Sequence, residues 1–179
     1  MGDRAECLLP THSQAAARGE DSLEVIYLHP GHVQVSAAPV ILKMLLGSCV
    51  GLFLFDPVLG VGGATHFMLP TWRGEGRPSE RYGDVAIAQL FSKLKSLGSE
   101  TKNVKAKMYG GACVLNAFSR TNGGHIGQKN VDLCNEILRR ESIEIVDQNV
   151  LGKSGRRVSM VSHTGKIVHE FVGTQNGTR

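Results

Sequence analysis

Cys49 and His66 are the two residues whose types and spacing could do chemistry together. Between them lies the segment 56–60, Asp-Pro-Val-Leu-Gly, in which proline presets one dihedral and glycine permits a positive φ, so a tight turn is predicted. Strands joined by such a turn pair antiparallel, and residues that face each other have numbers with a constant sum. Residues 49–55 and 61–69 are therefore expected to form a hairpin that brings the thiol and the imidazole together.

The position of the turn decides how the two side chains meet. A turn centred between Pro57 and Val58 gives a sum of 115 and places Cys49 opposite His66, whereas a sum of 117 makes them diagonal neighbours on one face. Either register brings their Cβ atoms to within roughly 4.5–8 Å. A sum of 116 would separate them, and the glycine pair 62–63 could form a bulge that re-aims His66.

A thiol beside an imidazole can attack an acyl carbon. An unperturbed cysteine has a pKa of about 8.5 and is only a few per cent thiolate at neutral pH, so an imidazole that takes the proton activates it. The backbone amides of Gly47 and Ser48, next to Cys49, could donate hydrogen bonds to a tetrahedral oxyanion. The spacing alone favours the structural alternative, in which Cys49 starts a buried strand and His66 is a core histidine whose hydrogen bonds are satisfied.

Length and composition indicate one domain without membrane insertion. The 179 residues predict a flexible extension at 1–22 and a single domain at 23–179. The net charge of +4 lacks clustered Lys and Arg, which argues against nucleic acid as a partner. The sequence has no signal-peptide pattern and no apolar run near ~20 residues, so a cytoplasmic location is expected. Four cysteines without a CxxC pair favour free thiols over disulfides or a metal site.

Short runs of β-forming residues and two amphipathic segments predict an α+β fold. Asp84 can cap the first helix. The loop at 72–78 lacks periodicity and could serve as a lid or as a recognition loop. The absence of regular βαβ alternation favours a layered α/β sandwich with mixed, largely antiparallel strands and two main helices. The predicted strands are 24–28, 32–37, 40–46, 49–55, 61–69, 104–109, 143–147, 157–162 and 166–172, and the predicted helices are 84–97 and 128–140.

Several motifs, in a preserved order over about residues 24–172, resemble the CheD family of chemoreceptor glutamine deamidases. The first three surround the predicted hairpin, and the others open the two helices or end strands. They are Gly47-Ser48-Cys49-Val50, Phe55-Asp56-Pro57, His66-Phe67-Met68-Leu69-Pro70, Tyr82-Gly83-Asp84, Gly110-Gly111-Ala112, Ile126-Gly127-Gln128-Lys129-Asn130 and Gly152-Lys153-Ser154-Gly155-Arg156-Arg157-Val158.

The resemblance implies roles for the two residues and a substrate. Cys49 would be the nucleophile and His66 its acid/base, and together they would convert glutamines of methyl-accepting chemotaxis receptors to glutamate, with receptor methyl esters as a second substrate. The resemblance implies no cofactor and no metal. It also implies association with CheC-type phosphatases, so an adaptor with weak or no catalysis is the alternative function.

The sequence departs from the family just upstream of Gly47, where the resemblance implies a threonine as third catalytic member. Lys43 or Met44 occupies that place, and neither can accept the imidazole N–H as a hydroxyl oxygen can. The third role is therefore unassigned. A zinc hydrolase built from Cys49, His66 and a distant Cys113 or His125 is a third hypothesis, but it lacks the short ligand spacing typical of zinc sites.

Overall fold

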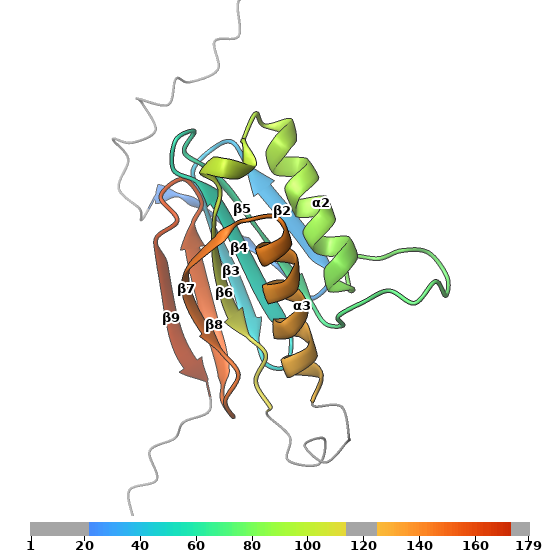
Figure 1. The fold of residues 1–179 in the computed structure, drawn as a ribbon. Helices are drawn as coiled ribbons and strands as arrows, with labels where there is room; N and C mark the ends of the chain where they lie inside the picture. The colour runs from blue at the N-terminus through green and yellow to red at the C-terminus, as the bar shows by residue number, and fades with distance from the viewer. Residues whose placement is uncertain (1–21, 114–124, 173–179) are drawn as a thin grey trace, which may run out of the picture.

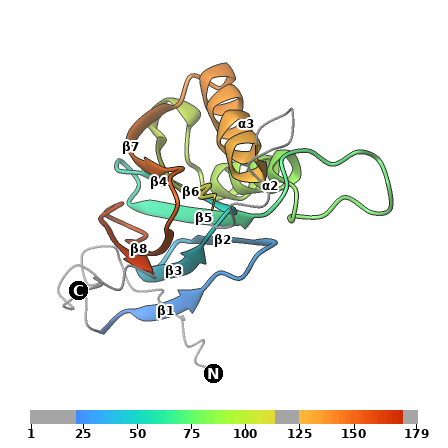
Figure 2. The ribbon, with the colours of Figure 1, turned by 90° about the horizontal axis from the view of Figure 1, so that it is seen from below.

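The protein is built in three layers, a four-stranded sheet, a five-stranded sheet and a pair of helices. The computed structural model describes residues 22–113 and 125–172, so the predicted extension lies, apart from Ser22, outside the described residues. Seen from below, the five-stranded sheet lies between the smaller sheet and the helices (Figure 2). Both helices cover the same face of that central sheet (Figure 1).

The sheet orders are β1-β3-β8-β9 and β2-β5-β4-β6-β7. All neighbouring pairs are antiparallel except β1 with β3 and β6 with β7, which confirms the mixed, largely antiparallel α+β sandwich. The elements are β1 Glu24–Tyr27, β2 His32–Ser36, β3 Val40–Leu46, β4 Val50–Asp56, β5 Val61–Phe67, α2 Gly83–Ser96, the 3-10 turn η2 Thr101–Asn103, β6 Lys105–Gly110, α3 Ile126–Arg140, β7 Glu144–Val150, β8 Gly155–Val161 and β9 Ile167–Val172.

The two predicted helices are present, with different starts. Tyr82 occupies the N-cap of α2 without a side-chain bond, so the prediction that Asp84 caps this helix is wrong. The Asp84 carboxylate instead accepts the backbone N–H of Trp72 through both oxygens at 3.1 Å, tying the long loop to the helix. The helix α3 begins two residues earlier than predicted, because His125 accepts the N–H of Gln128 through Nδ1 and caps the first turn.

The hairpin of β4 and β5 adopts the register with the sum of 117, in which Gly51 faces His66. Asp56 shapes the turn, since its Oδ1 accepts the N–H groups of Val58 and Leu59 at 2.8 and 3.1 Å. The glycine pair produces no bulge, because the ladder runs without a shift. A Cβ at Gly62 would lie 2.3 Å from the carbonyl oxygen of Ser162, so close approach of another backbone explains this glycine.

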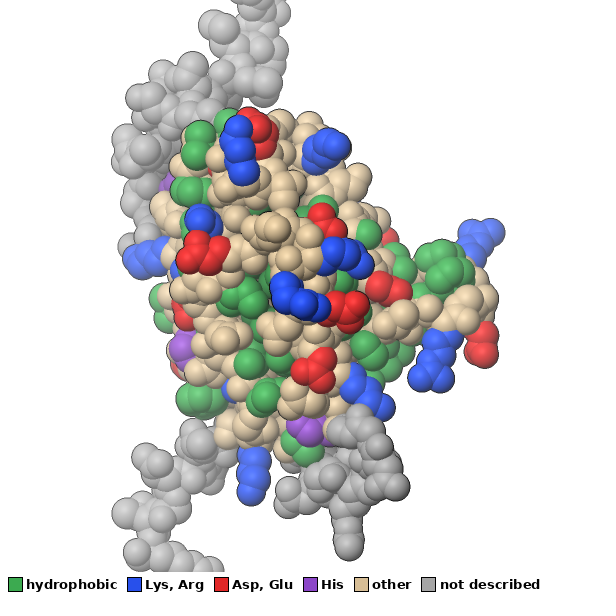
Figure 3. All heavy atoms as spheres, viewed as in Figure 1, with side chains coloured by type: hydrophobic (Ala, Val, Ile, Leu, Met, Phe, Trp, Pro, Cys, Tyr) green, Lys and Arg blue, Asp and Glu red, His purple; other side chains and the backbone are tan. Residues whose placement is uncertain are grey.

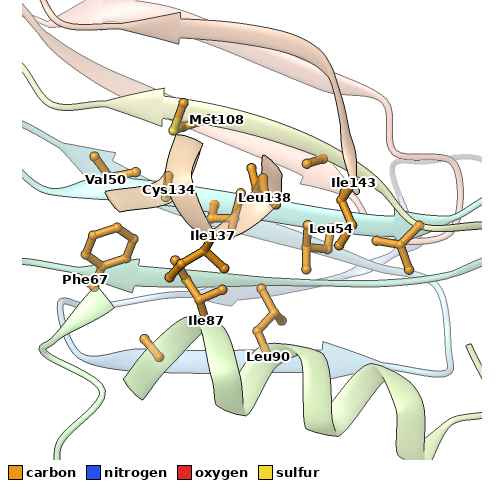
Figure 4. Packing of buried hydrophobic residues seen from close by; sticks show 14 of the residues in the cluster. Val50, Leu54, Phe67, Ile87, Leu90, Met108, Cys134, Ile137, Leu138 and Ile143 are labelled. Atoms are coloured by element: carbon orange, nitrogen blue, oxygen red, sulfur yellow. The ribbon is translucent and has the colours of Figure 1, made fainter. Parts of the chain in front are cut away.

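The central sheet has an apolar cluster on each face. Val50, Leu52 and Leu54 of β4 point toward the helices, where they meet residues such as Ile87 and Leu138 (Figure 4). Alternate residues of β4 and β5, including Phe53 and Ala64, belong to a second cluster between the sheets. Each fully buried Leu contributes about 1.5–3 kcal/mol relative to an exposed one. The two clusters therefore hold the ends of β4 and β5, and the residues beside them, in fixed positions.

The face that carries the helices shows Lys and Arg interspersed with Asp and Glu (Figure 3). Such mixing gives this face no extended region of a single charge sign. Neither of the described helices α2 and α3 is long and apolar enough to cross a membrane.

Candidate active site

His66 lies near the end of β5, with its side chain on the face between the two sheets. It is only 2% exposed. Its Nδ1 lies 3.0 Å from the carbonyl oxygen of Leu28, and its Nε2 is buried without a hydrogen-bond partner among the described residues. A carbonyl oxygen can only accept, so the proton of the neutral ring belongs on Nδ1 and Nε2 keeps its lone pair. The ring is thus held in the tautomer that a general base requires.

The carbonyl group that orients His66 is itself held by the main chain. The N–H of Leu28 donates to the carbonyl oxygen of Lys43 at 2.8 Å. The following turn closes over the histidine, because the N–H of Gly31 donates to the carbonyl oxygen of His66 at 2.7 Å. Main-chain groups therefore connect position 43, one of the two places where a threonine was expected, to the imidazole.

The surroundings of His66 favour its neutral form. Burial lowers the pKa of the imidazole below its ordinary value of 6.5, and the nearby His29 and His32 lower it further. The hydrogen bond to Leu28 opposes this shift. Burial also raises the pKa of the Cys49 thiol above 9.0, with its own backbone N–H acting in the opposite direction. Both groups are consequently uncharged at neutral pH.

Cys49 is half-buried in the bend between β3 and β4 and packs against the cluster between the sheets. It lies two residues before Gly51, the residue that faces His66 in the ladder. The alternation of β4, continued one residue before Val50, puts Cys49 on the face of His66 as a diagonal neighbour, the second of the two arrangements that keep them together. The Cβ atoms of such neighbours lie roughly 7 Å apart, within reach of side-chain rotation.

Three consecutive carbonyl groups fix the backbone around the thiol. The oxygens of Gly47 and Cys49 accept the N–H groups of Ala112 and Gly111, both at 2.8 Å. The oxygen of Ser48 accepts Nδ2 of Asn130 at 3.2 Å. Within the described chain, the N–H groups of residues 47, 48 and 49 donate no backbone hydrogen bond to another residue. The bend is therefore anchored through its acceptors, while its donors are left available.

Gly110 allows β6 to approach Cys49. Its φ is 105°, and a Cβ there would lie 2.2 Å from the carbonyl oxygen of Cys49. We expect Gly110→Ala to lower the free energy of unfolding by more than the ~1–3 kcal/mol of backbone strain alone, measured by urea titration. Gly74→Ala is the control, because Gly74 also has a positive φ of 87° but nothing lies within 4 Å of the added Cβ. Equal losses in the two variants would contradict the close-approach role.

The other residues considered from the sequence lie elsewhere. Met44 belongs to the cluster between the sheets, whereas strand alternation turns Lys43 to the outer face of its sheet, away from the imidazole. His125 caps α3, and the N–H of Cys113 donates to the carbonyl oxygen of Gly152. Among residues 22–113 and 125–172, no group of three His, Cys, Asp or Glu is placed to hold a metal ion.

Two components of the site were not found from the sequence. The carbonyl oxygen of Leu28 leaves no signature in the sequence, because every residue type has a backbone carbonyl oxygen. Asn130 lies within a motif noted above, but its burial and its bonds to two loops depend on how α3 packs. The only available signal was an amide side chain on the apolar side of an amphipathic helix.

Comparison with known proteins places this sequence in a family. The family model described as CheD chemotactic sensory transduction matches residues 68–170. A probable chemoreceptor glutamine deamidase CheD of Sulfurimonas denitrificans is 33% identical over 82% of this chain and 93% of its own length. The protein of that name from Trichlorobacter lovleyi is 34% identical over 79% of this chain and 87% of its own length. The probable chemoreceptor glutamine deamidase CheD 1 of Anaeromyxobacter dehalogenans is 38% identical over 74% of this chain and 76% of its own length. The chain belongs to the CheD family.

Proposed function

We propose that the protein hydrolyses the side-chain amide of specific glutamines on methyl-accepting chemotaxis receptors, in the cytoplasm, to give glutamate and ammonia. The three relatives described above are each named as a probable chemoreceptor glutamine deamidase. The observation that carries the proposal is the buried Nε2 of His66, which has no partner in the part of the chain that the structure describes and lies on the same face of the sheet as Cys49. An oriented base beside a thiol is the arrangement that cysteine acyl chemistry needs.

In the first half of the reaction, Nε2 of His66 takes the proton of the Cys49 thiol, and the thiolate attacks the amide carbon of the glutamine side chain. The backbone N–H groups of Gly47, Ser48 and Cys49 are the candidate donors to the resulting oxyanion, since their carbonyls are anchored and their N–H groups are not. The C–N bond then breaks while the His66 imidazolium protonates the nitrogen. Ammonia leaves, and a thioester of Cys49 remains.

In the second half, His66 removes a proton from a water molecule that attacks the thioester carbon. The C–S bond breaks, the thiolate recovers a proton from His66, and glutamate is released. One water is consumed and one ammonia is formed for each glutamine. A receptor glutamyl methyl ester presents the same acyl carbon with methanol as the leaving group, so methylesterase activity would use the same residues.

The bond from His66 to Leu28 favours an enzyme over an adaptor that only binds CheC-type phosphatases. The adaptor hypothesis rested on the implied association with CheC-type phosphatases, with the missing threonine at positions 43–44 as a reason to expect weak catalysis. The Leu28 carbonyl accepts the Nδ1 proton at 3.0 Å and supplies the orienting role without that hydroxyl. The departure from the family pattern therefore gives no reason to expect lost catalysis.

The shift of the His66 pKa predicts the acid side of the pH profile. Catalysis needs neutral His66, and burial lowers its pKa below 6.5. The value of kcat/KM should therefore be retained as the pH falls through 6.5 and should decline only at the lower, shifted pKa. Initial rates on a receptor peptide between pH 4.5 and 8 would test this, and a midpoint above 6.5 would contradict it.

The direct test incubates the purified protein with a cytoplasmic receptor fragment in water enriched in oxygen-18. Peptide mass spectrometry should show glutamine converted to glutamate at defined positions, with one heavy oxygen in each new carboxylate. Free ammonia should appear in equal amount. A receptor fragment whose glutamines stay unchanged, while the protein binds it or a CheC-type phosphatase, would instead support the adaptor function.

A further inference from the structure

We propose that Asn130 is a positioning residue that sets the distance between Cys49 and His66, a role that rests on the proposed function. Asn130 lies on α3, more than sixty residues from either of them in sequence, and is fully buried at 0% exposure. Its Nδ2 donates to the carbonyl oxygen of Ser48 at 3.2 Å and to that of Met68 at 2.9 Å. One amide group therefore joins the segment of the thiol to the segment of the base.

The two bonded carbonyls lie where the ladder between β4 and β5 ends. Val50 and Phe67 form its last pair on this side, and the N–H of Met68 turns away to the carbonyl oxygen of Arg81 at 2.9 Å. Ser48 directly precedes Cys49, and Met68 follows His66 by two residues. Beyond the last ladder pair, Asn130 bridges the two chain segments in place of backbone hydrogen bonds.

The chemistry of the amide fixes its orientation. Both neighbours are acceptors, so the NH₂ group must face them, and its two hydrogens match the two carbonyl oxygens. The Oδ1 atom is buried and has no hydrogen-bond partner within residues 22–113 and 125–172. A buried oxygen without a partner costs stability, so packing alone does not account for an amide at this position. The bridge to Ser48 and Met68 does account for it.

Two glycines bring α3 close enough for Asn130 to reach the carbonyls. A Cβ on Gly127, in the first turn of α3, would lie 2.3 Å from the carbonyl oxygen of Gly111. Gly111, with a φ of 70°, is the residue whose N–H binds the carbonyl oxygen of Cys49. The helix is thus pressed against the same strand end that anchors the thiol, and the position of the thiol relative to α3 is set at two points.

The test compares Asn130→Asp and Asn130→Ser with the wild type and with Cys134→Ala. The aspartate keeps the size but replaces the NH₂ group by an oxygen that repels both carbonyls, and the serine can donate only one hydrogen bond. Cys134 is the matched control, since it lies one turn further along α3 and is also 0% exposed but contacts neither carbonyl through a hydrogen bond. Urea titration shows which variants are folded under the assay conditions. If Asn130→Asp does not fold, Asn130→Ser alone is compared with the wild type.

Both Asn130 variants should lower kcat on a receptor peptide by roughly 10–100-fold, because a displacement of about 1 Å between reacting groups has that effect. Their KM should stay within about twofold of the wild type, since substrate contacts are not removed. Cys134→Ala should keep kcat within about twofold despite its lost packing. An unchanged kcat in the Asn130 variants, or an equal fall in Cys134→Ala, would overturn the proposal.

A second readout does not depend on deamidation. The rate of Cys49 alkylation by iodoacetamide at neutral pH, followed by peptide mass, reports how well His66 accepts the thiol proton. The wild-type rate should exceed that of His66→Gln, and the Asn130 variants should fall to the rate of His66→Gln. If receptor peptides are never modified but this pattern holds, the proposed function fails and the positioning role stands; if the Asn130 variants keep the wild-type rate, the positioning role fails.

Discussion

Cys49→Ala is expected to abolish the conversion of receptor glutamines, with a fall in kcat of at least about 10³-fold. The variant removes the sulfur atom that is proposed to form the thioester, and neither the imidazole nor the N–H groups of the bend can replace it. Alanine fits where the half-buried thiol packs against the cluster between the sheets, so the fold should persist. Peptide masses of a receptor fragment, sampled over time at equal enzyme concentration, measure the effect.

Cys113→Ala provides the matched control for the loss of a thiol. Cys113 is likewise half-buried and lies just after the strand end that anchors Cys49. Its replacement should leave kcat within about twofold of the wild type. Glutamine conversion that survives in Cys49→Ala would rule out the thioester route, and comparable losses in both variants would point to a general requirement for reduced cysteines.

His66→Gln should lower kcat by about 10²–10⁴-fold, the usual contribution of a positioned general acid/base. The glutamine amide can still donate to the carbonyl oxygen of Leu28, so the turn around it should keep its shape, but it cannot take a proton from the thiol. Activity on a receptor peptide and the Cys49 alkylation rate should fall together. A fall in activity with unchanged alkylation would assign His66 a role in the later proton transfers only.

His32→Gln is the control for this variant. His32 pairs with His66 in the ladder between β2 and β5 but faces solvent. Its loss should leave kcat close to that of the wild type. Because His32 contributes to the lowered pKa of His66, the acid limb of kcat/KM should move to slightly higher pH in this variant. A fall in kcat as large as that of His66→Gln would mean that the base had been assigned to the wrong histidine.

The register of the hairpin that carries His66 was predictable to within a few alternatives, because a short turn restricts the possible registers. Two of the three registers considered put the side chains of Cys49 and His66 on one face, and the structure has one of these two, with Gly51 opposite His66. Once the register is known, the alternation of side chains in a strand determines which residues share a face. The helices were equally accessible, because their apolar spacing reports the face that packs against the sheet.

The partners of β1 and β2 could not be predicted, because only a short Pro-Gly turn separates these strands and yet they enter different sheets. β1 lies parallel to β3, and β2 pairs antiparallel with β5. The chain crosses from one layer to the other at this turn, which is why the carbonyl group of Leu28 reaches His66. A contact between a main-chain atom and a distant side chain depends on this crossing, and no local residue pattern records it.

Point mutation cannot delete the carbonyl oxygen of Leu28, since every residue type supplies the same acceptor. The contribution of Lys43 to the same chain of hydrogen bonds is also a carbonyl oxygen. The side chain at position 43, one of the two places where the family's threonine was expected, can therefore change while the imidazole stays oriented. Among related genomes, the absence of that hydroxyl is accordingly a poor criterion for setting a gene aside as inactive, and the path of the backbone around the histidine is a better one.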